Sequence, residues 1–385
     1  MKSLLIASLL MFMWQPASAD LTLTFTVTVH LDCEKPVDPP IPPVIVGEWD
    51  TWIPSASVNS QSGGYGSFSS DSQHIAIRHG RTWSIVAIDG TERVLTHPAN
   101  GASSHDFMWA SADNQYFWLN GQRLELYSLA GELQSSWPLT TSDTATVQWR
   151  SGTGSNRAKQ FVLGSQEVSQ DVYHQWMQAI TVDGPQEGFW VRDLPGRPEY
   201  RWHNVYVRND GYGGSLSGVN QTIEWITDYV GSYVKQVPKP GEERQHSHES
   251  WEGDETLFWY SVTDGLRLQK VTKDETTVLK EITQGELKAA IGTTAFVAGG
   301  HTDLRGDGAL VSAVTYDQSI PADQRIWSVL YWDRSTIRMV YTGVKFNPAN
   351  FHENLLPSLS PNNLYAAFHD QGGVRISSIP ETDDN

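Results

Sequence analysis

The chain has 385 residues, a formal net charge of -17 and a single cysteine. The negative charge argues against a nucleic-acid partner and against adhesion to anionic lipid, because both need a basic surface. One cysteine cannot form an intramolecular disulfide, so the fold has to be stabilised by buried apolar surface. A chain of this length ordinarily suggests two or three domains, but regularly repeated β structures can run longer as one unit.

Residues 1–19 have the layout of a cleavable secretory signal. Lys2 precedes an apolar run over residues 4–14, and a stretch of small residues ends at Ala19, before Asp20. No later segment has the roughly 20 consecutive apolar residues that a membrane span needs. We therefore expect a mature chain that begins near Asp20, is not inserted in a membrane, and is periplasmic or secreted.

Residues 20–43 form a separate segment. Residues 21–31 alternate threonine with apolar side chains, which predicts one strand, and residues 35–43 contain five prolines. The proline-rich stretch is typical of a stiff linker. We expect this appendage to precede a single domain over residues 44–385, and its strand either to stand apart or to pair with the edge of that domain.

One unit recurs through residues 44–385: a short apolar strand, a tight polar turn carrying Asp or Asn, a second strand, then a third and often a fourth. Asp, Asn and Gly suit such turns because they tolerate positive φ. Seven units at intervals of about 40 to 55 residues predict an all-β, seven-bladed β-propeller. The turns are Ser70-Asp71-Ser72, Ala112-Asp113-Asn114, residues 152–156, Asn209-Asp210-Gly211, Gly253-Asp254-Glu255, Gly306-Asp307-Gly308 and Pro361-Asn362-Asn363.

Local patterns add detail to this repeat. The apolar residues 83–88 followed by Asp89-Gly90 predict a strand and a hairpin, and residues 284–291 have the best helical pattern in the chain. Residues 146–237 are irregular, so the third and fourth units are poorly marked. The chain has 16 tryptophans, and we expect most of them to fill the space between sheets.

Five histidines precede these turns by similar distances, and we expect each to open the first strand of its blade. They are His105, His203, His248, His301 and His352. The first strand of a propeller blade is the innermost, so these residues would surround the mouth of a central channel. Imidazole is a common ligand of divalent metals and the usual proton carrier near neutral pH, which predicts a metal-binding or catalytic site at this mouth.

Cationic residues concentrate around His203 and His248, as Arg197, Arg201, Arg208 and Arg244. Guanidinium is planar and always charged, and it binds both oxygens of a carboxylate at once. The pattern therefore favours a substrate that carries sugar carboxylates. Arg201 and Arg244 are the strongest candidates.

Three segments resemble the oligogalacturonate lyases, which are seven-bladed propellers of the broader TolB-like type. The segments begin at Ser247-His248-Glu249, at Gly300-His301-Thr302 and at Phe351-His352-Glu353, and Trp202-His203-Asn204 falls where the family has its proton-abstracting histidine. The resemblance implies a lyase that cleaves acidic oligosaccharide or polysaccharide by β-elimination. It covers about the last 185 residues.

The resemblance also implies roles for individual residues. His203 would remove the proton on C5, with Arg201 beside it, and a divalent metal, manganese in the family, would be bound by His248 and His352. Asn354 stands near the family's second closing histidine, and His301 would be a further ligand or would support the ligands from behind. The family's arginine falls near residues 175–179, where this chain has none, so Arg201 or Arg244 would replace it. Arg244, Arg208, His246 and Tyr200 are the expected substrate contacts, and Tyr200 or Tyr206 the expected acid.

A second interpretation is a non-enzymatic periplasmic propeller of the TolB kind, a scaffold or binding module whose channel mouth takes a peptide or another subunit. It predicts no bound metal and no tight cluster of His203, His248, His301 and His352. Serine hydrolysis is disfavoured, because the chain has no Gly-x-Ser-x-Gly motif.

Overall fold

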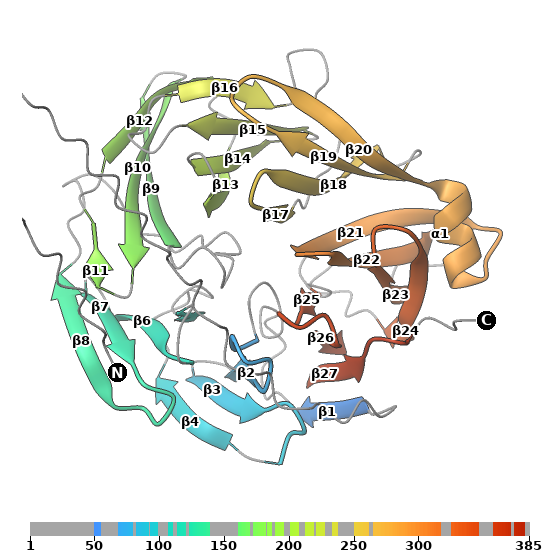
Figure 1. Cartoon of the computed structure of the whole chain (residues 1–385), viewed down its shortest axis with the longest axis horizontal. Coiled ribbons are helices and arrows are strands. Elements are labelled where there is room, and N and C mark those ends of the chain that lie inside the picture. The colour runs from blue at the N-terminus through green and yellow to red at the C-terminus, as the bar shows by residue number, and fades with distance from the viewer. Residues whose placement is uncertain are drawn as a thin grey trace, which may run out of the picture. The chain divides into compact units, whose positions relative to one another are not determined.

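In the computed structural model, the described residues run from 50 to 381, with the longer gaps at 55–67, 99–106, 139–160, 196–200, 238–249, 317–324 and 346–356 and several shorter ones. Within the compact unit Ile45–Asn385 they form β-strands and one helix (Figure 1). The predicted signal segment, strand and linker lie outside the described residues. No helix in the described part has the length and apolar character to span a membrane.

The described strands form seven antiparallel sheets, most of them four-stranded meanders in which each strand pairs with the next. The first three sheets are made by β2 (His74–His79), β3 (Thr82–Ala87) and β4 (Arg93–Pro98); by β5 (Phe107–Trp109), β6 (Tyr116–Asn120), β7 (Arg123–Tyr127) and β8 (Leu133–Pro138); and by β9 (Phe161–Ser169), β10 (Val172–Thr181), β11 (Gly184–Pro185) and β12 (Phe189–Pro195).

The remaining sheets continue this order along the chain. They are made by β13 (Arg201–Val207), β14 (Tyr212–Gly218), β15 (Gln221–Thr227) and β16 (Tyr233–Val237); by β17 (Ser250–Glu252), β18 (Glu255–Ser261), β19 (Gly265–Val271) and β20 (Thr276–Thr283); by β21 (Phe296–Arg305), β22 (Gly308–Tyr316), β23 (Ile326–Trp332) and β24 (Ile337–Lys345); and by β25 (Ser358–Leu359), β26 (Tyr365–Asp370) and β27 (Gly373–Ser378) with β1 (Asp50–Pro54). The architecture is therefore all-β and propeller-like.

The last sheet takes its outer strand from the start of the unit, because β1 pairs antiparallel with β27. The Asp50 carboxylate accepts hydrogen bonds from the Arg375 guanidinium and from the Ser377 hydroxyl, which fixes the register at one end of β1. A sheet that joins the two ends of a chain leaves fewer open edges, as closed β architectures do. The sequence did not reveal this strand.

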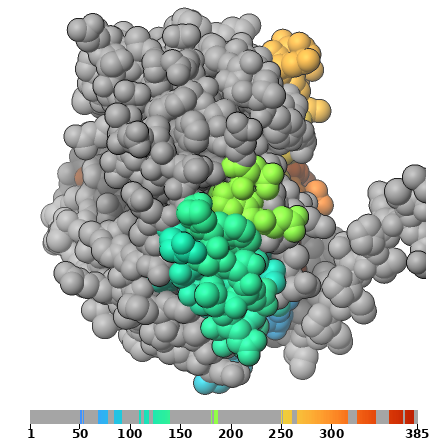
Figure 2. Space-filling model, turned by 90° about the vertical axis from the view of Figure 1, so that its left-hand side faces the viewer, coloured from blue at the N-terminus to red at the C-terminus, as the bar shows by residue number. Residues whose placement is uncertain are grey.

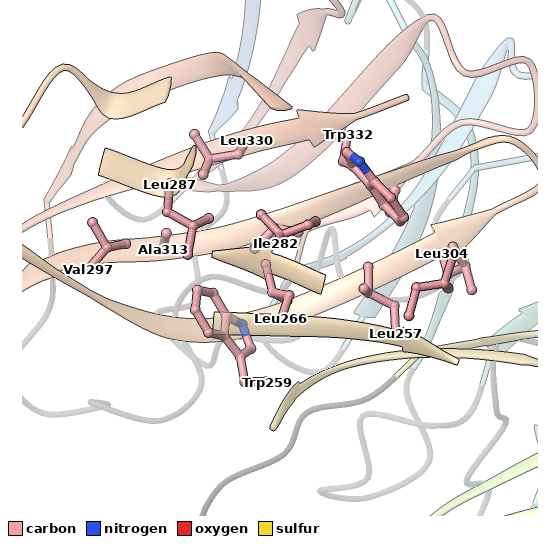
Figure 3. Close-up of a cluster of buried hydrophobic side chains, with 13 residues drawn as sticks. Leu257, Trp259, Leu266, Ile282, Leu287, Val297, Leu304, Ala313, Leu330 and Trp332 are labelled. Carbon is pink, nitrogen blue, oxygen red and sulfur yellow. The ribbon is translucent and has the colours of Figure 1, made fainter. Parts of the chain in front are cut away.

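The sheets pack face to face through buried apolar side chains. Figure 3 shows one such cluster, between the sheet β17–β20 and the sheet β21–β24. Its buried members are Leu257, Trp259, Leu266, Leu268, Ile282, Leu287, Val297, Leu304, Ala309, Val311, Ala313, Leu330 and Trp332. Each larger side chain in such a cluster contributes roughly 1.5 to 3 kcal/mol by leaving water. The sheet β21–β24 is covered on both faces, so its strands carry apolar residues on both sides.

Two further clusters repeat this packing. Leu310, Val329, Leu359 and Phe368 belong to the cluster between β21–β24 and the last sheet, and Trp109 belongs to the one between β2–β4 and β5–β8. The described buried tryptophans, Trp109, Trp118, Trp259, Trp327 and Trp332, are core residues. For these five, the expectation that tryptophan fills space between sheets is confirmed.

Trp137 of β8 packs against β11 at the junction of the second and third sheets. Its indole ring lies so close to Gly184 that a Cβ atom there would be 2.6 Å from Nε1, and Gly184 has a φ of +113°. Figure 2 shows the β7–β8 region and the Gly184–Pro185 strand side by side on the surface. Gly184 is thus required both by the backbone conformation and by the tryptophan.

The predicted turns are correct where the structure describes them. Positive φ is found at Ser72, Asn114, Gly253, Gly306 and Asn363. The last four lie between the first and second strands of their sheets, and Ser72 lies between β2 and Phe68, which pairs with Ile75 of β2. The hairpin predicted at Asp89-Gly90 is also present, with Gly90 at a φ of 74°. The choice of Asp, Asn and Gly at these positions therefore follows from their tolerance of left-handed backbone.

The third turn is different. Residues 152–156, like the fourth predicted turn Asn209-Asp210-Gly211, lie outside the described residues. The first described hairpin of the third sheet joins Ser169 to Val172, which are paired. The sequence marked this unit as irregular, and the sheet differs from the others because β10 pairs with β9, β11 and β12. Here β10 continues past β12 to meet β11, so the simple order of four strands is lost.

The predicted helix is present as α1 (Gln284–Ile291). The Thr283 hydroxyl accepts the Glu286 N–H and the Glu286 carboxylate accepts the Thr283 N–H, so the helix begins with a capping box. It ends at Gly292 in the left-handed conformation. Leu287 is the buried residue of the helix and joins it to the apolar cluster of Figure 3.

A buried histidine in β26 should make the stability of this fold depend on pH. Burial lowers the pKa of His369 from 6.5 to about 4, although a hydrogen bond to the Gly373 backbone opposes the change. Its Nε2 has no hydrogen-bond partner among the described residues. Because the unfolded chain binds the proton more readily, stability is complete above pH 6.5 and falls between pH 6.5 and about pH 4.

The expected loss from this histidine is on the order of 3 kcal/mol across that range. It is measured by denaturant unfolding at a series of pH values. His369→Gln should remove this part of the pH dependence, while the remaining dependence comes from other groups. Equal slopes for the two proteins between pH 6.5 and pH 4 would show that His369 is not the group responsible.

Candidate functional site

Most of the predicted site residues lie outside the described residues. They are Tyr200, Arg208, Arg244, His246, His248, His352 and Asn354. Arg201 and His203 lie in β13, where the structure describes the backbone, and His301 lies in β21, where it describes the side chain as well. The site can therefore be built from the backbone of β13 and from the surroundings of His301.

His203 and His301 occupy equivalent places in the first strands of two sheets. The β13–β14 ladder shifts register between Trp202 and Asn204, and the β21–β22 ladder shifts between Gly299 and Thr302. Each histidine thus lies at a break, four positions before the last paired residue of its strand, Val207 or Arg305. Four residues of strand span about 13 Å, so both breaks lie well away from the hairpin end.

His248 precedes Glu252, the last paired residue of β17, by the same four positions. For His203 and His301, the recurrence predicted from the sequence is therefore also a recurrence in strand register. The histidines do not open their strands, however, since β13 begins at Arg201 and β21 at Phe296. The strands are longer than their apolar runs because the backbone continues to pair beyond the break.

His301 is 8% exposed and is followed on its strand by a buried ion pair. The Asp303 carboxylate and the Arg305 guanidinium lie 3.4 Å apart, with side chains 0% and 6% exposed. Alternation along β21 places Asp303 and Arg305 on the same face, toward the last sheet, where the Leu359 N–H donates to Asp303 Oδ2 at 2.7 Å. His301 therefore lies at one end of a polar strip between two sheets.

Burial raises the pKa of the Asp303 carboxyl, while Arg305 and the Leu359 N–H act against this rise. A carboxylate without water is costly unless charges and donors surround it. Asp303 has one partner from its own strand and one from the neighbouring sheet. We interpret it as a structural group that holds β21 against β25.

The opposite face of β21 is tied to the sheet β17–β20. The Thr302 and Ser250 hydroxyls lie 3.0 Å apart, and the Thr302 hydroxyl also donates to the Leu257 carbonyl at 3.2 Å. Both Thr302 and Ser250 are fully buried. The strand that carries His301 is thus hydrogen-bonded to the sheet before it and to the sheet after it.

The hairpin ends of the first strands are joined by a second set of polar contacts. The Arg334 guanidinium donates to the Gly306 carbonyl and binds Glu255 Oε2 at 2.6 Å, linking turns of two sheets. The Asn114 amide donates to Asp71 Oδ2 at 2.6 Å, and the Asn362 N–H donates to the Ser72 hydroxyl at 3.2 Å. These contacts stabilise the hairpin end of the first strands, away from the register breaks.

The described residues do not complete the metal set that the resemblance implies. They contain no group of three or more His, Cys, Asp or Glu side chains able to hold a metal. His301 is a suitable donor type, but the neighbouring Asp303 has Leu359 and Arg305 as partners. The described residues do not by themselves form the site, so the metal remains a prediction that depends on His248, His352 and Asn354.

These features define an all-β, propeller-like protein with histidines at equivalent register breaks. No protein-family model matches the sequence, and no curated protein matches it. Among solved structures, a functionally unknown protein from Desulfotomaculum acetoxidans DSM 771 is 11% identical with a TM-score of 0.47, over 79% of this chain and 91% of that one. The WD40 domain of SCAP from fission yeast is 10% identical with a TM-score of 0.42, over 86% and 94%.

Sequence reasoning missed Ser312, Asp303 and Arg305. Asp303, Leu304 and Arg305 alternate between charged and apolar residues, which is typical of a strand with one face in water. In the structure the polar face is covered by another sheet. A signal was available in Asp303 and Arg305, because two opposite charges two residues apart on a strand share one face.

Proposed function

We propose that this chain is an exported lyase that cleaves uronate-containing oligosaccharide or polysaccharide by β-elimination. Its body would be a seven-bladed propeller closed by β1. The site would lie at the end of the first strands where the register breaks occur. Substrate would be bound there by arginines, and His203 would be the base.

The observation that carries this proposal is the shared register of His203 and His301. A histidine that only satisfied a local hydrogen bond would have no reason to recur at a ladder break in different sheets. His248 repeats the spacing to its hairpin. We expect side chains at one level of these first strands to act on one ligand.

The chemistry requires three roles. Neutral His203 takes the proton from C5, Arg201 and Arg244 bind the uronate carboxylate that stabilises the resulting charge, and the C4–O bond breaks as Tyr200 or Tyr206 donates a proton to the leaving oxygen. The products are an unsaturated uronate and a shortened chain with a new hydroxyl. A divalent ion on His248 and His352 would supply further electron withdrawal from the carboxylate.

The proposal is tested by incubating the purified chain with a panel of polyuronates, with and without a chelator, while following ultraviolet absorbance of the unsaturated product. We expect one or a few members of the panel to react, and the chelator to slow the reaction. A broad panel without any product, together with no metal in the purified protein, would contradict it.

Export makes a separate prediction. Expression of the whole chain in a bacterium with a periplasm should give a product outside the cytoplasm whose first residue is Asp20 or its neighbour. Amino-terminal sequencing of that product measures this. Full-length protein retained in the cytoplasm, with Met1 or Lys2 at its terminus, would show that residues 1–19 are not a signal.

The second candidate is a binding or scaffold propeller, and the burial of His301 favours it. A side chain that is 8% exposed beside a buried ion pair is placed as a core polar residue would be. The channel mouth would then take a peptide or another subunit. This reading predicts a stable complex with a protein partner and no change in a uronate polymer.

A further inference from the structure

The break in β21 is a β-bulge. Gly299 pairs with Ala313 and Thr302 pairs with Val311, so Gly300 and His301 both lie opposite the single residue Ser312. At such a bulge the extra residue loses its ordinary ladder partners. The backbone of His301 therefore needs other hydrogen bonds, since it is buried.

Ser312 supplies these bonds from β22. Its hydroxyl accepts the His301 N–H at 2.6 Å and donates to the His301 carbonyl at 3.1 Å. One fully buried side chain thus holds both backbone groups of the same residue. Because N–H and C=O on either side of Cα are fixed, the direction in which the imidazole leaves the backbone is fixed as well.

The two glycines before His301 provide the room for this arrangement. A Cβ atom on Gly300 would overlap with the Ser312 hydroxyl and would lie 2.7 Å from the Trp327 ring. A Cβ atom on Gly299 would overlap with the ring of Trp259. Gly299 and Gly300 are therefore needed because other side chains pack closely against their backbone, and not because of a left-handed turn.

We infer that Ser312 is a positioning residue that orients His301 through its backbone toward the ligand of the histidine site. This inference rests on the proposed function, because it assigns His301 a ligand there. The hydroxyl does not touch the ligand. It sets the geometry of a residue that does, as groups behind metal-binding histidines commonly do.

The test uses the whole exported chain labelled with nitrogen-15 in histidine. The ring signals of His301 are assigned by their loss in His301→Gln. In Ser312→Ala these signals should shift and broaden, because the two hydrogen bonds between the Ser312 hydroxyl and the His301 backbone are lost. Gly300→Ala should have the same effect, because its methyl group would displace the Ser312 hydroxyl together with the Trp327 ring. It keeps the serine, and so it serves if Ser312→Ala folds poorly.

Ser328→Ala is the matched control. Ser328 is a buried serine in the same sheet, and its hydroxyl pairs with that of Thr342 at 3.0 Å, away from His301. This variant should leave the His301 signals in place. Comparing Ser328→Ala with Ser312→Ala therefore distinguishes a general loss of stability from a change in the orientation of the His301 ring.

Titration with Mn²⁺ alone gives the second measurement. Ser312→Ala should weaken Mn²⁺ binding by about 10-fold or more, and Ser312→Thr, which keeps the hydroxyl, should restore most of it. His301 signals that stay unchanged in both Ser312→Ala and Gly300→Ala would overturn the inference. If the signals change but the unaltered chain binds no Mn²⁺, the positioning role stands and the metal-assisted function fails.

Discussion

Replacing His203 by alanine is expected to slow uronate β-elimination by on the order of 10²- to 10⁴-fold, the contribution of a positioned general base. No other group in the proposed site has the assigned role of taking the C5 proton. The rate is measured from the ultraviolet absorbance of the unsaturated product, on the polymer that the panel identifies. Substrate affinity should change much less than the turnover rate, because the arginines remain.

His97→Ala is the control for this variant. His97 lies on β4, the last strand of its sheet, and pairs with Trp83. Its removal takes away one histidine without touching a first strand, so the rate should stay near that of the unaltered chain. If His203→Ala retains full rate while product is formed, another residue is the base.

Replacing Asp303 by alanine is expected to destabilise the fold by about 3 to 5 kcal/mol. The change leaves the buried Arg305 guanidinium without its carboxylate and the Leu359 N–H without its acceptor. Both losses fall between the sheet β21–β24 and the last sheet. The free energy of unfolding is obtained from denaturant titrations monitored by tryptophan fluorescence.

An exposed ion pair provides the comparison. Arg267 and Glu281 lie 2.8 Å apart with side chains 28% and 44% exposed, so Glu281→Ala should cost no more than about 1 kcal/mol. Asp303→Leu combined with Arg305→Met should recover most of the stability, because it removes both buried charges together. Similar small losses for Asp303→Ala and Glu281→Ala would mean that the buried pair does not hold the sheets.

Much of the fold was predictable because its strongest determinants are local. Asn114, Gly306 and Asn363 have positive φ where the repeat places its turns, since few residue types adopt that conformation. The helix α1 (Gln284–Ile291) also matches its predicted range. Its boundaries are encoded nearby, in Thr283 and Gly292, which cap its two ends.

The features that sequence reasoning missed depend on contacts between distant segments. The pairing of β1 with β27 joins residues more than 300 positions apart, and no local pattern around Asp50 announces its partner Arg375. The roles of Asp303 and Ser312 likewise depend on neighbouring strands, because their partners Leu359 and His301 come from other strands of the fold. A strand pattern gives the alternation of side chains but not what covers each face.

The site was predicted as a set of histidines. In the structure, His203 and His301 share a position in strand register. The shared break at His203 and His301 is a backbone property that spacing in the sequence suggested only roughly. The roles of the metal ligands and of the arginines remain predictions, because those residues lie outside the described residues.

A crystal structure of the exported chain grown with Mn²⁺ and a uronate oligosaccharide, with the metal located by anomalous scattering, tests the central claim most directly. We predict that the rings of His248 and His352 bind one ion with His301 beside them, and that His203 lies against the sugar residue held there, at the end of the first strands opposite the hairpins. Rings directed to different faces of the molecule, with the metal and sugar bound elsewhere or not at all, would contradict it.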